Sequence, residues 1–181
     1  MKYSRANTIE SFNSGEDLDF IFFWGHQPKK DESIAKSCFS QWWPARFSHE
    51  GVEYKSAEHF MMAEKARLFG DEDIRNQIIR SKSPKEAKNL GRKVRGFDNT
   101  LWEENKYQIV KKANQLKFLQ NEELKTFLKQ TKNKTIVEAS PVDPIWGIGM
   151  AEDNPDAINP NNWKGENLLG YILMEIRDST F

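Results

Sequence analysis

The middle of the chain carries helix signals almost without interruption, and this stretch constrains the fold more than any other. Ser56 is placed to cap a helix that runs to about Phe69 and stops at Gly70. A second clear start lies at Ser83, which precedes Pro84 in the sequence SPKE, the pattern of a capping box. Further helices are expected over residues 71–81, from 98 to about 118, over 121–131 and over 166–179.

Strand signals are few and short. Residues 19–25 (DFIFFWG) indicate a buried strand that ends at Gly25, and residues 134–140 (KTIVEAS) indicate another. Two more short strands flank a turn at residues 49–51, and a polar loop over 26–37 is placed to edge a site. Helices with a few short strands predict an α+β, predominantly helical fold.

The length of the chain suits one compact domain over residues 1–181. Residues 1–18 are polar, and we expect them to form a loose N-terminal extension. No internal repeat, low-complexity tract or interdomain linker interrupts the rest.

The charge balance argues against one broad class of function. Lys plus Arg equals Asp plus Glu, at 27 each, and the formal net charge is zero. A protein that coats DNA or RNA by neutralising phosphates is usually basic, so general coating is disfavoured. A local basic set remains, for which a solvated helix face is favoured over a phosphate clamp. Its members are Lys85, Lys88, Arg92, Lys93 and Arg95.

The single cysteine, Cys38, excludes an internal disulfide framework and a cysteine-based zinc site. No spacing of histidines and carboxylates predicts another metal site. The N-terminus has no apolar leader, and no stretch approaches the length of a membrane span. We therefore expect a cytoplasmic protein that uses no metal or redox cofactor.

One predicted helix places two opposite charges beside apolar side chains. Glu58 and Lys65 are seven residues apart, so they lie within about 20° of one another and about 10 Å apart along the axis. They share a stripe with Met62 and Phe69. Two interpretations are open: solvated charges at the edge of the stripe, which periodicity alone favours, or the wall of a pocket. His59 in the same helix is interpreted as a core residue rather than a ligand.

A second candidate region is the sequence VEASPVDPIWGIG, in which a strand ends and a long loop begins. Pro144 favours an extended backbone at Asp143, shortly before Trp146. Gly147 and Gly149 permit the backbone to approach a ligand closely. An irregular stretch of about 25 residues is unusual inside a compact domain, and such loops are commonly functional.

Six segments follow one another in an order that resembles the NADAR family of YbiA-like proteins. They are FFWG, CFSQWWPARF, EGVEYKSAEHFMMAEKARLF, LGRKVRGFDNTLWEENKYQIVKKANQLKF, IVEASPVDPIWGIG and GENLLGYILMEIR. The resemblance implies a compact, mostly helical domain with a few short strands and an enzyme that acts on N-glycosidic bonds. It also implies two substrate classes, which are ADP-ribose attached to guanine bases in nucleic acid and ribosylamino-pyrimidine phosphates of riboflavin synthesis.

The resemblance assigns site residues by their positions in the motifs. The catalytic residues that it implies are Glu58, Lys65 and Asp143. The substrate-binding residues that it implies are Phe23, Trp24, Gly25, Trp102, Trp146, Gly147, Gly149 and Asn167. Trp102 alone would be interpreted as a core residue, but an indole can also stack on a base.

The chain departs from the family pattern at two places. Gln41 stands where the family often has asparagine, and Met61 and Met62 stand where many relatives carry a polar glutamine. We expect these changes to alter polar contacts around the base or the ribose.

The chemistry of these residues suits cleavage of an N-glycosidic bond. Carboxyl groups such as those of Glu58 and Asp143 can support charge on the sugar and protonate the departing base. A desolvated Lys65 can instead exchange into a sugar imine as a Schiff base. We expect an enzyme that removes ADP-ribose from guanine.

Three alternatives to this function are open. One is an N-glycosidase for riboflavin-synthesis intermediates, and another is a non-catalytic module that binds ADP-ribose. A helical scaffold or interaction protein would explain the charged helix faces but not the Asp-Pro-Ile-Trp-Gly loop. The sequence also leaves open the oligomeric state and the choice among DNA, RNA and a free nucleotide.

Overall fold

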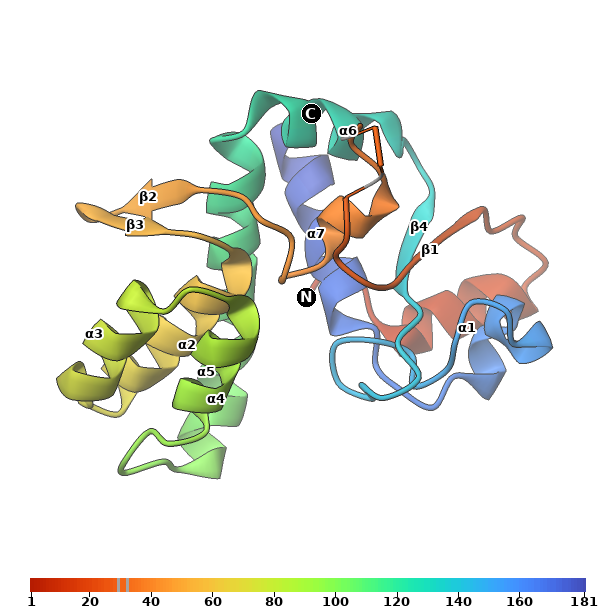
Figure 1. Ribbon diagram of the computed structural model, residues 1–181. Helices are drawn as coiled ribbons and strands as arrows, with labels where there is room; N and C mark the ends of the chain where they lie inside the picture. The colour runs from red at the N-terminus through yellow and green to blue at the C-terminus, as the bar shows by residue number, and fades with distance from the viewer. Residues whose placement is uncertain (29, 32) are drawn as a thin grey trace. The chain divides into compact units, whose positions relative to one another are not determined.

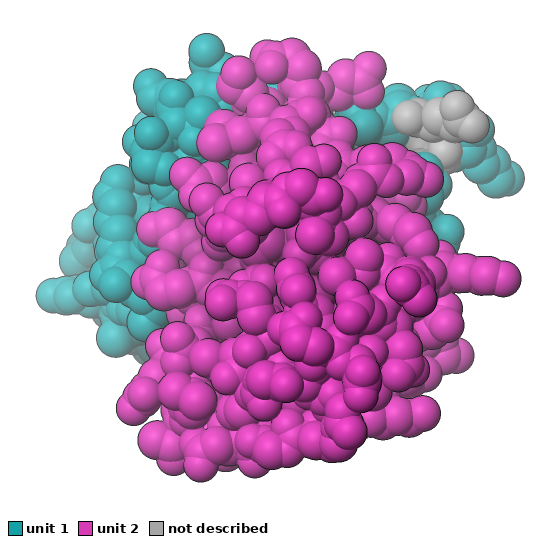
Figure 2. All heavy atoms as spheres, turned by 90° about the vertical axis from the view of Figure 1, so that its left-hand side faces the viewer, with its two compact units in different colours: residues 1–40, 126–181 teal, residues 41–125 magenta. Residues whose placement is uncertain are grey.

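The computed structural model describes residues 1–28, 30, 31 and 33–181, and these form two compact units. Unit 1 comprises Met1–Ser40 and Thr126–Phe181, and unit 2 comprises Gln41–Lys125 (Figure 2). The boundary between them falls within helix α6 (Glu122–Gln130). Helices dominate both units and the strands are short, which confirms the predominantly helical α+β class.

Unit 2 contains a β-hairpin and four helices, drawn in orange to green in Figure 1. The elements are β2 (Phe47–His49), β3 (Val52–Tyr54), α2 (Ala57–Leu68), α3 (Glu72–Arg80), α4 (Pro84–Gly91) and α5 (Asn99–Leu119). The hairpin is antiparallel, with Phe47 opposite Tyr54, and it turns at Glu50 and Gly51, both of which have positive φ. The side chains of Ser56, Asp71 and Ser83 cap the helices that follow them, as the sequence predicts for the first and third.

Helix α2 is the centre of unit 2, because α3, α4 and α5 all pack against it. Its residues are buried without a break from Ala57 to Glu64. The predicted narrow apolar stripe is therefore wrong for most of the helix, which is enclosed on several sides. The enclosure requires a close approach at Gly91 of α4, where an added Cβ would overlap the sulfur of Met62.

Unit 1 is built on a two-stranded parallel sheet with α7 packed against it (Figure 1). Strand β1 (Phe20–Phe23) pairs with β4 (Thr135–Glu138), so that Phe23 lies opposite Glu138. The remaining elements of the unit are α1 (Arg5–Asn13), η1 (Lys36–Phe39), η2 (Pro155–Ile158), η3 (Pro160–Asn162) and α7 (Leu168–Thr180). The two 3-10 helices η2 and η3 lie within the predicted long loop. Residues 29 and 32 of the predicted polar loop lie outside the described residues.

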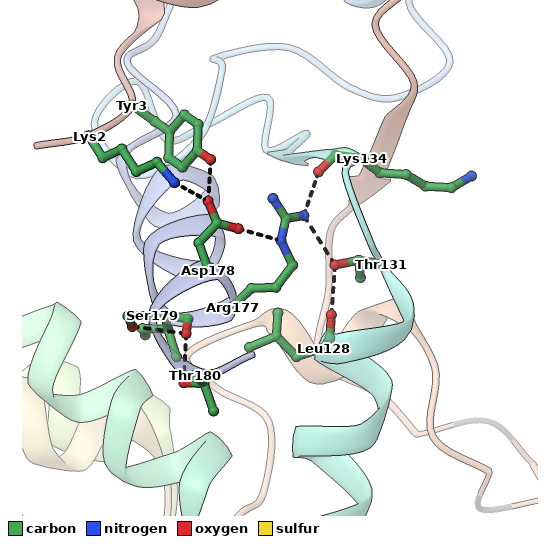
Figure 3. Close-up of polar contacts among 10 residues, drawn as sticks. Lys2, Tyr3, Leu128, Thr131, Lys134, Arg177, Asp178, Ser179 and Thr180 are labelled. Atoms are coloured by element: carbon green, nitrogen blue, oxygen red, sulfur yellow. Dashed lines mark hydrogen bonds and ion pairs between the residues drawn. The ribbon is translucent and has the colours of Figure 1, made fainter.

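The N-terminal segment differs from the loose extension that the sequence suggests. Ser4 caps helix α1, and the residues before it bond to α7 (Figure 3). The backbone N–H of Lys2 donates to Glu175, while its ammonium and the Tyr3 hydroxyl both donate to Asp178. These attachments are polar and reach across the sequence, so no apolar periodicity announces them.

No helix among the described residues combines the length and the apolar character that a membrane crossing requires.

Candidate active site

Lys65 lies near the C-terminal end of α2 with its amine against two aromatic rings. Its Nζ is 4.3 Å from the ring centroid of Phe97 and 5.5 Å from that of Trp102. Both distances are within the range of a cation–π interaction. Burial lowers the pKa of the Lys65 amine below its ordinary value. Lys65 and Trp102, which are both predicted site residues, therefore lie close together in unit 2.

An ion pair holds the loop that carries Phe97. Arg95 donates from its backbone N–H and from its guanidinium to Asp71, whose side chain is 1% exposed. These hydrogen bonds hold the pKa of Asp71 well below its usual range. The ring of Phe97 then packs 5.2 Å from that of Phe69 at the end of α2, so both sides of the loop are fixed. Phe97 is not among the residues that the sequence predicts for the site.

Glu58 occupies the first turn of α2, where the positive end of the helix dipole favours a negative charge. The residue is 4% exposed, so it is not the solvated surface charge that periodicity favours. Its backbone N–H donates to the carbonyl of Gln41 at 3.0 Å. Seven residues of α2 separate Glu58 from Lys65, or about 10 Å along the axis.

The two departures from the family pattern meet in the same place. The side-chain amide of Gln41 donates to the sulfur of Met61 at 3.4 Å, and both residues are buried. A thioether is a weak acceptor, so this contact is a weak one. The backbone carbonyl of Gln41 accepts from the backbone N–H of Glu58, which ties Gln41 to the first turn of α2.

His59 is a core residue, as the sequence predicts. It is 1% exposed, and its Nδ1 shares a hydrogen bond of 2.8 Å with the hydroxyl of Ser56. Burial lowers the pKa of His59, and the nearby Lys55 ammonium lowers it further. The neutral imidazole thus supports the start of the helix that carries Glu58.

In unit 1, Asp143 organises the loop that follows β4. One carboxylate oxygen of Asp143 accepts hydrogen bonds from the backbone N–H groups of Ile145 and Trp146, at 2.9 and 2.8 Å. Its second oxygen, Oδ2, takes part in none of the hydrogen bonds recorded among the described residues. Trp146 is half-buried and its neighbour Ile145 is exposed. The Asp143 carboxylate therefore fixes the backbone of the loop that carries Trp146.

The glycines and the asparagine of this region serve the backbone. An added Cβ at Gly147 would lie 2.7 Å from the carbonyl oxygen of Glu138, and one at Gly165 would overlap that of Gly147. Gly149 has a φ of +67°. Other atoms do approach the backbone closely at these glycines, as expected, but they belong to the protein's own chain. Gly165 is not among the predicted site residues, although the loop that contains it has few other glycines.

Asn167 ties the loop to the sheet. Its side chain is completely buried, donates to the carbonyl of Ile136 and accepts from the N–H of Glu138. Asn167 also adopts a left-handed conformation (φ 54°) at the start of α7. Its amide is committed on both sides, so it positions the loop rather than contacting a substrate.

The three residues of the FFWG motif divide by exposure. Phe23 is completely buried and its ring packs edge-on against Phe39. Its side chain therefore belongs to the core and is not exposed to a substrate. Trp24 is 57% exposed, and Gly25 beyond it has a φ of +77°. Of the three, only Trp24 offers a side chain to a ligand.

The predicted site residues thus fall into two groups, one in each unit. Unit 2 carries Glu58, Lys65 and Trp102, and unit 1 carries the others. Among residues 1–28, 30, 31 and 33–181, no three histidine, cysteine, aspartate or glutamate side chains are arranged as metal ligands.

Comparisons with known proteins identify relatives that share this fold. The NMR structure of the Escherichia coli protein YbiA has a TM-score of 0.70 and 31% identity, covering 89% of this chain and 84% of that one. "N-glycosidase R617" of Acanthamoeba polyphaga mimivirus is 45% identical over 164 residues, which are 88% of this chain and 95% of that protein. "N-glycosidase YbiA" of Escherichia coli K12 is 35% identical over 136 residues, covering 75% of each chain.

The fold is therefore that of the YbiA-like proteins. The profile of the NADAR domain matches residues 22–180, and the chain belongs to the NADAR domain family.

Proposed function

We propose that this protein is an N-glycosidase that removes ADP-ribose from guanine bases of nucleic acid through a Schiff base on Lys65. The observation that carries the proposal is the environment of Lys65, a half-buried amine between two aromatic rings with a lowered pKa. The N-glycosidase names of relatives support the broader activity. The family resemblance supplies the guanine substrate.

A lysine in this environment is suited to attack a sugar that is attached through an amino nitrogen. The exocyclic nitrogen of guanine forms a C=N bond to the anomeric carbon as the bond from that carbon to the ring oxygen breaks, and this oxygen takes a proton. The neutral Lys65 amine then adds to the carbon. A proton moves from the lysine nitrogen to the guanine nitrogen, and the bond to guanine breaks, which leaves the sugar as a lysine imine.

Water completes the cycle. It adds to the imine carbon, the bond to the lysine nitrogen breaks, and the sugar leaves as an aldehyde. The sum is one guanine and one ADP-ribose released for one water consumed. Glu58 is the group of unit 2 that we assign to proton transfer, and Asp143 keeps the second acidic role predicted from the sequence.

Reductive trapping tests the covalent step. Borohydride added during turnover should reduce the imine and fix ADP-ribose on Lys65, which peptide mass spectrometry would locate. Lys112→Ala, an exposed lysine of α5, is the matched control and should be trapped like the wild type. Absence of an adduct, together with near-normal turnover by Lys65→Ala, would rule out the Schiff base.

The substrate is tested by offering both classes to the same protein. Release of unmodified guanine from an ADP-ribosylated oligonucleotide, without release of base from ribosylamino-pyrimidine phosphates, is the expected result. The reverse pattern would assign the protein to riboflavin intermediates. A non-catalytic module would bind ADP-ribose and release nothing, and its binding would be unchanged in Glu58→Gln.

A further inference from the structure

The outer face of α4 carries a stripe of positive charge. Lys85, Lys88 and Arg92 are spaced at i, i+3 and i+7, so they lie within about 60° of one another around the helix. Arg92 extends the stripe because it keeps a helical conformation just past the last residue of α4. The buried residues Ala87 and Gly91 lie on another side of the helix, and α4 packs against α2.

Within the described part of the chain, these cations have no carboxylate partners. From 82 to 93 the sequence contains five basic residues and one acidic residue, Glu86, whose carboxylate accepts from the backbone N–H of Lys82. No carboxylate oxygen of a described residue lies within 4.0 Å of the side-chain nitrogens of these five residues. Arg95 does not share this property, because it pairs with Asp71 and Asp73. The five are Lys82, Lys85, Lys88, Arg92 and Lys93.

These five cations lie within residues 82–93 of a chain whose formal net charge is zero. Exposed lysines gain little from ion pairs, so their lack of partners costs little stability. Four lysines and one arginine on one short segment nevertheless create a local positive potential, which attracts a polyanion.

An aromatic ring adjoins the stripe. The Nζ of Lys88 is 5.7 Å from the ring centroid of Trp42, which is half-buried. Cations that follow a phosphate backbone, with an aromatic ring on which a base stacks, are the combination found on surfaces that bind single-stranded nucleic acid.

The stripe is connected to Lys65 by a short, fixed segment. Arg92 and Phe97 are five positions apart, and that length of chain spans at most about 17 Å. The ring of Phe97 lies 4.3 Å from the Lys65 amine, and Arg95 anchors the segment between them to Asp71. A stacked strand rises by about 3.4 Å per nucleotide, so the segment corresponds to roughly five nucleotides.

We propose that the α4 stripe binds the phosphate backbone of a single-stranded nucleic acid whose modified guanine reaches Lys65, so that the substrate is a polymer rather than a free nucleotide. The link to Lys65 rests on the proposed function, whereas phosphate binding by α4 does not depend on it. Unit 2, which carries both features, is the magenta part of Figure 2.

Salt dependence of binding tests the stripe without any turnover. The probe is a fluorescent, unmodified single-stranded oligonucleotide, as DNA and as RNA, titrated at about 50 to 200 mM salt. Five phosphate contacts predict that wild-type affinity falls about 100-fold over this range, because each contributes about 0.7 to the logarithmic slope. Lys85→Ala, Lys88→Ala and Arg92→Ala together should leave a fall of about sevenfold.

The matched control removes the same charge elsewhere. Lys112→Ala, Lys129→Ala and Lys164→Ala together replace three exposed lysines outside α4, and this protein should keep the wild-type slope. Alanine is the best helix former, so the triple variant in α4 should keep its fold, which thermal unfolding verifies. Equal slopes for the two triple variants would overturn the proposal, as would an equally salt-dependent affinity for polyglutamate.

Turnover connects the stripe to the reaction. The α4 triple variant should raise KM at least tenfold for an ADP-ribosylated oligonucleotide and leave kcat/KM unchanged for an ADP-ribosylated guanine mononucleotide. An equal loss on both substrates would overturn the link to the polymer. If neither substrate is turned over by the wild type, the proposed function fails, while the oligonucleotide titration still decides whether α4 binds nucleic acid.

Discussion

Lys65 in unit 2 and the loop from 143 to 149 in unit 1 differ in how their polar groups are used. The Lys65 amine has aromatic rings around it, and burial keeps its pKa low. In the loop, the Asp143 carboxylate accepts two backbone N–H groups, and Asn167 bonds to β4 through both ends of its amide. One region places an amine against aromatic rings, and the other uses several of its polar atoms in hydrogen bonds to its own backbone.

The contrast separates two kinds of site residue that a motif cannot distinguish. A residue whose hydrogen-bonding capacity is already used stabilises the fold, so its substitution should lower stability first. A residue held in an apolar environment costs stability, so its substitution should lower activity first.

The largest effect is expected for Lys65→Met. Methionine keeps the length and the apolar contacts to Phe97 and Trp102, and it removes the amine and its desolvated charge. We expect turnover to fall by about 10³-fold or more, as for loss of a catalytic nucleophile. The thermal unfolding temperature should stay the same or rise.

Lys112→Met is the control, since this exposed lysine of α5 should leave both quantities unchanged. A Lys65→Met protein that retains a tenth of the wild-type turnover would break the comparison, because Lys65 would then belong with the structural residues.

The opposite pattern is expected for Asn167→Ala. The change removes two hydrogen bonds to β4 and leaves the part-buried N–H of Glu138 and the buried carbonyl of Ile136 without their partner. Each such buried group costs about 1–3 kcal/mol, so the free energy of unfolding should fall by about 2–4 kcal/mol. Urea unfolding measures the loss. Asn161→Ala, at an exposed position, should cost less than about 0.5 kcal/mol.

Gly147→Ala tests the same side of the comparison without removing a hydrogen bond. Its Cβ would meet the carbonyl oxygen of Glu138 at 2.7 Å, a backbone atom that cannot easily move. Overpacking of this kind costs about 1–3 kcal/mol. If Gly147→Ala instead unfolds like the wild type and loses only activity, the glycine serves a ligand, as the sequence suggests.

The helices and strands were largely predictable from the sequence. Which of the predicted site residues serve mainly to stabilise the fold was not. Caps at Ser56 and Ser83 and the turn at Gly51 are local signals, and the structure confirms all three. Helix α1 was missed because its attachments through Thr8 and Asn13 are polar and lie more than 140 residues away along the chain.

The same limit applies to the candidate site. The positions of Lys65 and Trp102 in the family motifs predict both as site residues, and the two lie close together in unit 2. Motif position could not find Phe97, because the approach of this ring to Lys65 depends on the Arg95–Asp71 ion pair. It also could not tell that Phe23 is a core residue, since burial is decided by residues distant in the sequence.

Phe97 offers a finer test of why the Lys65 amine is reactive. Phe97→Ala should admit water and raise the pKa of Lys65 toward its ordinary value, so less amine is neutral at a given pH. If the pKa rises by about one, the neutral fraction at a pH below it falls by about tenfold, and the rate of borohydride trapping falls with it. Phe97→Leu keeps the apolar cover but loses the ring face that favours the ammonium, so its trapping rate should not fall.

The pH dependence of trapping in these three proteins checks the assignment. Nearby charges on the facing helix are engaged elsewhere, because Asp98 caps α5 and Glu103 pairs with Lys106. Burial is accordingly the cause of the lowered pKa of Lys65. A trapping rate that falls equally in both variants would show that Phe97 acts by packing alone.

The smallest effect concerns the other buried base of α2, His59. Burial lowers its pKa, so between the ordinary value near 6.5 and the folded value the unfolded chain binds a proton that the folded chain does not. The free energy of unfolding must therefore decrease as the pH falls through this window, by up to about 1.4 kcal/mol per pH unit. Above the ordinary value near 6.5 this contribution to stability is fully present.

His59→Gln isolates that contribution, because glutamine does not titrate and can still bond to the hydroxyl of Ser56. Between about pH 7.5 and 5.0 the free energy of unfolding, measured in urea, should fall further for the wild type than for this variant. His26→Gln, in the polar loop, should follow the wild type. Because carboxylates titrate alike in all three proteins, parallel curves for wild type and His59→Gln would mean that His59 binds its proton equally in both states.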